Sequence, residues 1–165
     1  MEDYVNVIMK LENEIDNDKI VEKEGKFPIL LTSVHSMEQV KEDGTIKFSE
    51  PLTKGIVKYI ANDLNLFYLI KTEDDGIDPN HNDKDEFKTR LIDMIKTNSI
   101  KLVFDIHGAS AKREFDVELG TMNNLTADFS TIMELKEAFE ENGLNVILNE
   151  PFKGGKITQY VFMNT

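Results

Sequence analysis

Continuous apolar runs alternate along this chain with stretches in which apolar positions recur every three or four residues. The runs at residues 28–34, 66–70 and 100–106 are typical of strands that are buried on both faces. Helical spacing follows the first two runs, and a further helix is expected over residues 129–142, before a strand at 145–148. This alternation of strands and helices predicts an α/β fold with a mostly parallel sheet.

Other segments have weaker patterns. Residues 4–9 are rich in strand-forming side chains and predict an edge strand, and residues 114–119 and 158–163 predict two further strands. Residues 11–27 are acidic and polar, which favours a loop or a loose hairpin, and residues 36–50 predict an irregular connection.

Composition narrows the function classes. The 165 residues suit a single domain, and a net charge of −12, from 19 basic and 31 acidic residues, argues against a nucleic-acid partner. The chain has no cysteine, so a metal would have to be held by His, Asp or Glu. Neither a signal-like start nor a membrane-spanning apolar run is present, so we expect a cytoplasmic location and no membrane partner.

Two histidines lie at the ends of buried strands. His35 follows the first apolar run, with Glu38 three residues later, and His107 follows the third run, two residues after Asp105. The carboxyl ends of parallel strands meet at one edge of a sheet, and two histidines with one carboxylate are a zinc-binding donor set. Asp105 could orient the His107 imidazole from behind. The alternative is a buried Asp–His pair with a structural role alone.

Further polar residues are candidates for binding a substrate. Asp78 and Asn80 lie in a turn-rich loop and could position a ligand, or could only form the turn. Arg113 could pair with a substrate carboxylate or stabilise an oxyanion, although surface arginines are common. The amides of Gly154 and Gly155 could approach an anion, or could only make a turn. Neither nucleotide-binding glycine motif is present.

Five short motifs occur in an order that resembles the N-formylglutamate amidohydrolase family, which is related to the zinc carboxypeptidases. The similarity covers the chain from about residue 28 to its end. The motifs are Ser33–Glu38, Asp78–Asn80, Asp105–Gly108, Asp116–Thr121 and Phe152–Gly155.

The resemblance implies a zinc ion held by His35, Glu38 and His107. It also implies a phosphorylase/hydrolase-like α/β/α sandwich of three layers, with residues 1–165 forming one zinc hydrolase-like domain. The implied reaction is hydrolysis of the C–N amide bond in a small N-acyl amino acid, such as N-formylglutamate. Arg113 would then take the carboxylate of this small-molecule substrate.

One departure from the family concerns the general base. Family members continue past the Gly-Gly motif into a strand that carries a catalytic glutamate, whereas this chain ends at Thr165. The resemblance therefore implies that the C-terminal part of the family domain is absent, which leaves Glu118 or Glu150 as candidate bases. Two alternatives stay open: a zinc carboxypeptidase or amidase acting on peptides or cell-wall fragments, and a non-catalytic metal-binding domain.

Overall fold

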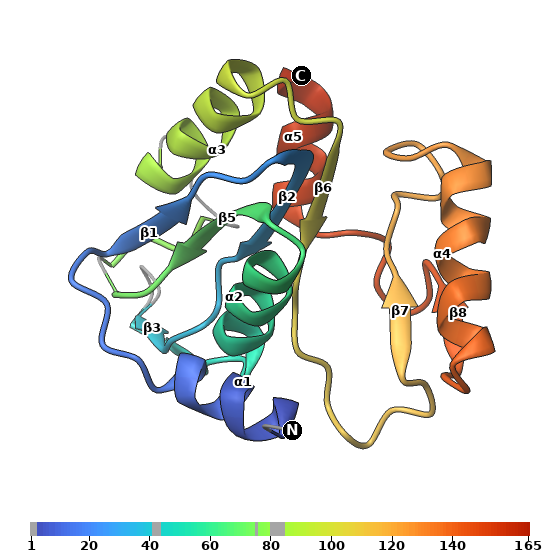
Figure 1. Cartoon of the computed structure of the whole chain (residues 1–165), viewed down its shortest axis with the longest axis horizontal. Coiled ribbons are helices and arrows are strands. Elements are labelled where there is room, and N and C mark those ends of the chain that lie inside the picture. Colours follow the sequence, from blue (N-terminus) through green and yellow to red (C-terminus); the bar gives the residue numbers. More distant parts are fainter. Residues whose placement is uncertain (1–2, 41–43, 75, 80–84) are drawn as a thin grey trace. The chain divides into compact units, whose positions relative to one another are not determined.

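The structure is a computed structural model that divides into two compact units, one of residues 1–108 and one of residues 109–165 (Figure 1). Each unit has a sheet of its own. The described parts of the chain are residues 3–40, 44–74, 76–79 and 85–165.

The first unit is built on a four-stranded sheet. Its strand order is β1 (Ile20–Lys23), β5 (Leu66–Lys71), β2 (Phe27–Ser33) and β6 (Leu102–Asp105). Strand β1 runs antiparallel to β5, whereas β2 is parallel to both of its neighbours. This arrangement confirms the predicted mixed and mostly parallel sheet, although the sequence had favoured a loop or loose hairpin where β1 forms.

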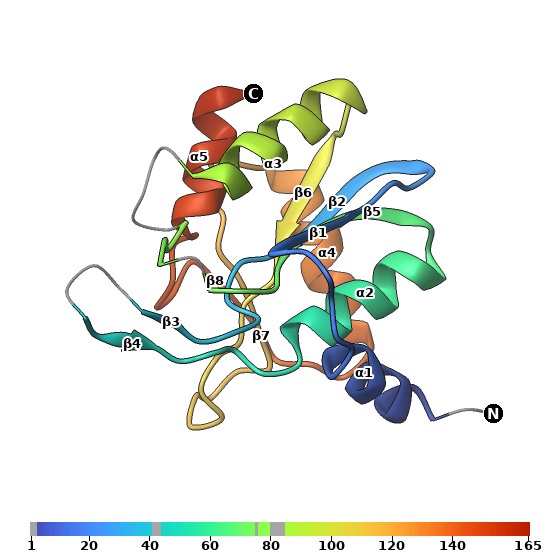
Figure 2. The same ribbon diagram turned by 90° about the vertical axis from the view of Figure 1, so that its left-hand side faces the viewer.

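Helices α2 (Thr53–Asp63) and α3 (Glu86–Thr97) cover opposite faces of this sheet, an arrangement compatible with an α/β/α sandwich (Figure 2). Adjacent residues of β2, Leu30 and Leu31, are both buried because each side chain enters the layer on its own side of the sheet. The core on the α2 side is formed by Leu31, Val57, Ala61, Leu66 and Ile70.

The N-terminal segment forms helix α1 (Tyr4–Glu12), so the predicted edge strand at residues 4–9 was wrong. The Asp3 carboxylate accepts a hydrogen bond from the Val5 amide at 3.1 Å, which caps the helix in the usual way. Helix α1 packs closely on α2 at Gly55, where a Cβ atom would lie 2.4 Å from the carbonyl oxygen of Ile8. Glycine therefore permits the close approach of the two helices.

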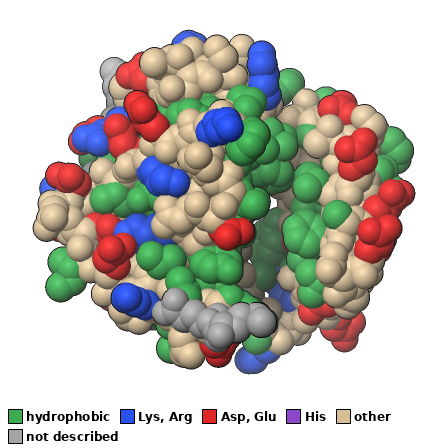
Figure 3. Space-filling model, in the orientation of Figure 1, with side chains coloured by type: hydrophobic (Ala, Val, Ile, Leu, Met, Phe, Trp, Pro, Cys, Tyr) green, Lys and Arg blue, Asp and Glu red, His purple; other side chains and the backbone are tan. Residues whose placement is uncertain are grey.

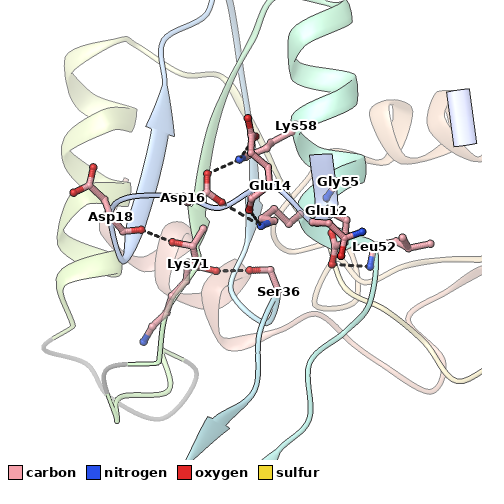
Figure 4. Close-up of polar contacts among 12 residues, drawn as sticks. Glu12, Glu14, Asp16, Asp18, Ser36, Leu52, Gly55, Lys58 and Lys71 are labelled. Carbon is pink, nitrogen blue, oxygen red and sulfur yellow. Dashed lines mark hydrogen bonds and ion pairs between the residues drawn. The ribbon is translucent and has the colours of Figure 1, made fainter. Parts of the chain in front are cut away.

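The last residue of α1 and the acidic segment that follows it are tied to α2 (Figure 4). The Glu12 carboxylate accepts hydrogen bonds from the amides of Leu52 at 3.1 Å and Gly55 at 2.7 Å. It thereby satisfies donors at the start of a helix that has no side-chain cap of its own. Lys58 is buried and pairs with Asp16 at 2.5 Å. These contacts fix the start of α2 and the turn before it.

The second unit pairs β7 (Val117–Leu119) in parallel with β8 (Val146–Leu148), and helix α4 (Phe129–Glu141) packs against both strands. These elements match the strands and the helix expected from the sequence. The last element is helix α5 (Lys156–Asn164), so the predicted strand at residues 158–163 was wrong. Apolar Ile157, Tyr160 and Val161 are three to four residues apart, a spacing that suits one face of a helix.

No helix in the described part of the chain combines the length and apolar character needed to cross a membrane. On the face shown in Figure 3, basic side chains are scattered among acidic ones and do not gather into one patch.

Candidate functional site

The ends of β2 and β6 bring two histidines together. The strands are parallel neighbours, with Thr32 opposite Asp105, and His35 and His107 follow a short distance beyond. Their ring centroids lie 5.3 Å apart with the ring planes inclined by 51°. The Ser36 hydroxyl donates to the carbonyl oxygen of Lys71 on β5, which ties the chain after His35 to the adjacent strand (Figure 4).

Glu50 completes a group of three possible metal ligands. One ligand atom each from His35, Glu50 and His107 lies within 4.8 Å of the other two, and we call these residues the His35–Glu50–His107 group. Glu50 Oε2 lies 2.9 Å from His107 Nδ1 and accepts a hydrogen bond from the Gly108 amide at 3.0 Å. His35 is buried, whereas a third of the His107 side chain is exposed.

The carboxylate in this group is that of Glu50, whereas the family resemblance implied Glu38. The Glu38 side chain is exposed and lies outside the group, because the chain turns after Ser36 and directs the next residue, Gln39, into the interior. The segment predicted as an irregular connection contains a short antiparallel hairpin of β3 (Gln39–Val40) and β4 (Ile46–Lys47), after which the chain returns to the site at Glu50.

A chain of hydrogen bonds holds Glu50 in place. Its backbone amide donates to the carbonyl oxygen of His35 at 2.8 Å. The Thr53 hydroxyl donates to the carbonyl oxygen of Glu50 at 2.8 Å and accepts from the Ser33 hydroxyl at 3.0 Å. The turn before α2 is thus joined to the end of β2, which fixes the carboxylate beside the histidines.

Asp105 lies behind His107. Its Oδ2 atom is 2.8 Å from His107 Nε2, and its Oδ1 atom accepts a hydrogen bond from the Thr32 hydroxyl at 2.7 Å. A carboxylate that is itself held in this way fixes the orientation of the imidazole. With Nε2 bonded to Asp105, the Nδ1 atom of His107 faces Glu50.

Gln39 has the corresponding place behind His35. Its Nε2 atom donates to the Val34 carbonyl at 3.2 Å, so its Oε1 atom faces His35 Nδ1, also at 3.2 Å. This orientation of the amide makes Nδ1 the protonated nitrogen of a neutral His35. The sequence did not predict a role for Gln39. The one feature that could have pointed to it is its position next to Glu38, a predicted metal ligand.

The surroundings separate the protonation states of the three residues. Burial lowers the pKa of His35, and the charge of Lys47 adds to this effect against the opposing charge of Glu50. Burial alone would lower the pKa of His107, but the charges and hydrogen bonds of Asp105 and Glu50 raise it to about 10. Burial would raise the pKa of Glu50, but hydrogen bonds from His107 and Lys47 lower it to about 2. Without a metal, His107 is therefore an imidazolium between two carboxylates.

The donor set fits a divalent metal ion. Two imidazoles and one carboxylate are a common ligand set for zinc, and they leave a coordination position open. Outer hydrogen-bond partners such as Asp105 and Gln39 are typical of metal-binding histidines. The group could hold a metal ion, and other divalent ions accept the same donors.

The other predicted site residue of the first unit that the structure describes is Asp78. It is buried in the segment after β5, and its charge acts to raise the pKa of His35. The carboxylate therefore lies within electrostatic reach of the group. Asn80, the second candidate of that loop, lies outside the described residues.

The remaining candidates belong to the second unit, whereas the His35–Glu50–His107 group belongs to the first. The Arg113 guanidinium lies 4.7 Å from the centroid of the Phe152 ring, and Glu118 accepts a hydrogen bond from the Phe152 amide at 2.6 Å. Gly154 has a φ of +109°, and Gly155 is the N-cap of α5. An open hollow of about 620 Å³ is lined by Ser110, Lys112, Arg113, Glu114, Phe115, Glu150 and Pro151.

Comparisons of the chain with protein-family models, curated proteins and solved structures give no match. The assignment to the N-formylglutamate amidohydrolase family therefore stays a prediction from the sequence motifs.

Proposed function

We propose that this chain is a zinc-dependent amidohydrolase that cleaves the C–N amide bond of a small N-acyl amino acid, with N-formylglutamate-like compounds as the substrate class. The observation that supports the proposal is the convergence of His35, Glu50 and His107 within 4.8 Å at the carboxyl ends of two parallel strands. The order of the five sequence motifs supports the reaction class.

In this proposal five residues of the first unit have defined roles. His35, Glu50 and His107 hold the ion, while Gln39 and Asp105 keep the two imidazoles in place by hydrogen bonds. A bound zinc ion supplies Lewis acidity toward the amide carbonyl and lowers the pKa of a bound water. Arg113 and Glu118, the candidates that the resemblance implied for binding the substrate carboxylate and for the base, belong to the second unit.

Zinc content and turnover test this proposal together. The purified chain is stripped with a chelator, reloaded with zinc and offered N-formyl amino acids, N-acetyl amino acids and short peptides. We expect one zinc per chain and selective cleavage of N-acyl amino acids, which are lost together in the variants His35→Ala and His107→Ala. Selective cleavage of peptides would instead favour a carboxypeptidase or amidase.

A specific observation favours a second candidate, a non-catalytic metal-binding domain. Of the described residues at the group, the carboxylates of Glu50 and Asp105 are both hydrogen-bonded to His107, so neither is placed to accept a proton from a water. Full zinc occupancy without cleavage of any amide would support this candidate over the enzyme.

A further inference from the structure

Lys47 brings a positive charge to the His35–Glu50–His107 group. Its ammonium nitrogen lies 2.9 Å from Glu50 Oε1, and its charge also lowers the pKa of His35. The ammonium therefore acts on two members of the group, from strand β4, although sequence reasoning did not single it out.

The β3–β4 hairpin fixes the position of this lysine. Lys47 is paired across the hairpin with Gln39, which is fully buried and bonded to both His35 and Val34. Backbone pairing with an anchored residue restricts where the lysine backbone can lie. The side chain then reaches Glu50 from a defined starting point.

The Lys47 ammonium retains hydrogen-bonding capacity. It has three N–H donors, and among the described residues it donates to Glu50 Oε1. A third of the side chain is exposed, so a ligand can approach it from solvent. Charge-assisted hydrogen bonds from an ammonium to a carboxylate are among the stronger polar contacts in proteins.

Local charge explains why an anionic ligand would need this residue. The carboxylates of Glu50 and Asp105 already balance the two positive charges of a divalent ion, and Asp78 adds a negative charge near His35. The chain as a whole has a net charge of −12. Without a further cation, the group would offer little attraction to an anion.

We propose that Lys47, together with a metal ion that the His35–Glu50–His107 group would hold, forms a subsite for the carboxylate of a small ligand. This inference rests on the proposed metal site and names a group for anionic ligands within the first unit. Arg113, the residue predicted for this role, belongs to the second unit.

The test uses the full chain loaded with Co²⁺, whose visible absorption reports on its ligands. Acetate serves as the anionic probe and imidazole as the neutral probe. The variants are Lys47→Met, Lys47→Arg and, as a matched control for the lost charge, Lys101→Met, which removes an exposed lysine of the same unit. We expect Lys47→Met to weaken acetate binding about 10-fold or more, as loss of a charge-assisted hydrogen bond does, and to leave imidazole binding within about twofold.

The other outcomes separate the alternatives. Lys47→Arg, which keeps the charge, should retain most of the acetate affinity, and Lys101→Met should match the parent. Equal loss of acetate and imidazole affinity in Lys47→Met would mean that Lys47 only supports Glu50, and unchanged acetate affinity would also overturn the subsite. If the parent chain takes up no Co²⁺, the proposed metal site fails and the subsite falls with it.

Discussion

Gln39 and Lys47 face each other across the β3–β4 hairpin, and each contacts a different member of the His35–Glu50–His107 group. Gln39 orients an imidazole, and Lys47 binds one oxygen of the carboxylate. One short hairpin thus supplies outer contacts to two of the three possible metal ligands. Metal affinity should therefore depend on residues that never touch the ion.

Replacement of Gln39 by leucine should weaken zinc binding about 10- to 100-fold, the usual effect of removing an outer partner of a ligand histidine. The cause is loss of the hydrogen bond that selects the ring orientation of His35. Competition with a chromophoric chelator measures the affinity. Val40→Ala, at an exposed position of the same strand, is the control and should bind zinc like the parent.

Glu50→Gln and Glu38→Gln form a matched pair that tests which carboxylate holds the metal ion: the one beside the two histidines or the one implied by the resemblance. Each variant removes one negative charge within the same connection. Zinc affinity should fall more than about 100-fold in Glu50→Gln, beyond the effect of losing an outer partner, and should not change in Glu38→Gln. If zinc affinity instead falls in Glu38→Gln and is unchanged in Glu50→Gln, Glu38 is the metal ligand and Glu50 is not.

The two histidines could be predicted from sequence because each follows a continuous apolar run, and parallel strands place their carboxyl ends at one edge. Glu50 could not be predicted in this way. It lies 15 residues after His35 in the numbering, and a hairpin without an apolar period brings it back. Glu38 was the nearer choice in sequence, but the backbone turns its side chain outward.

Helix α1 shows the other limit of local pattern. Its β-branched and aromatic residues favour a strand, but the Asp3 cap and packing on α2 at Gly55 stabilise the helix. The cap depends on the position of one residue, and the close approach depends on a neighbouring helix. The preferences of the individual residues of α1 for helix or strand contain neither effect. In α5, too, residue preference predicted a strand where a helix forms, but there the three-to-four-residue spacing of the apolar positions indicates the helix.

Zinc binding should release a proton. In the metal-free protein the pKa of His107 is about 10, so its imidazole is protonated near neutral pH, whereas the lowered pKa of His35 keeps that ring neutral. A metal can use His107 only after its proton has left. We expect about one proton released per ion and an affinity that rises roughly tenfold per pH unit between about pH 6.5 and 8.

Calorimetry in buffers of different ionisation enthalpy measures this release directly. Asp105→Asn is the informative variant, because loss of the Asp105 charge should bring the pKa of His107 down and flatten the pH dependence. Binding without proton release in the parent chain would contradict the protonation state inferred for His107.

The metal-free chain should lose stability as the solution becomes alkaline. The pKa of His107 is raised from 6.5 to about 10, so its contribution is complete below pH 6.5 and disappears as the pH rises toward 10. We expect the free energy of unfolding to fall by roughly 1–3 kcal/mol over this range, allowing for solvent screening of a partly exposed side chain. Glu50 acts at the opposite end, because its lowered pKa contributes above pH 4.5 and is lost toward pH 2.

Urea unfolding of the metal-free chain at pH 7 and pH 9.5 measures this effect, with His107→Gln as the comparison. The difference in stability between the two pH values should be smaller in the variant, because the titrating imidazole has been removed. An equal difference in both proteins would show that other groups cause it.

Gly55→Ala should destabilise the chain, although alanine is the better helix former. A Cβ atom at this position would lie 2.4 Å from the backbone carbonyl of Ile8, and a backbone atom cannot rotate away as a flexible side chain can. Helix α1 would have to shift, which would also strain the hydrogen bond from Gly55 to Glu12. Overpacking of this kind costs about 1–3 kcal/mol of unfolding free energy, measured by urea denaturation.

Asn62→Ala, on an exposed position of the same helix, is the control and should be neutral or slightly stabilising. If Gly55→Ala is as stable as that control, α1 does not pack on α2 as closely as described, and the turn that carries Glu50 is held by other contacts.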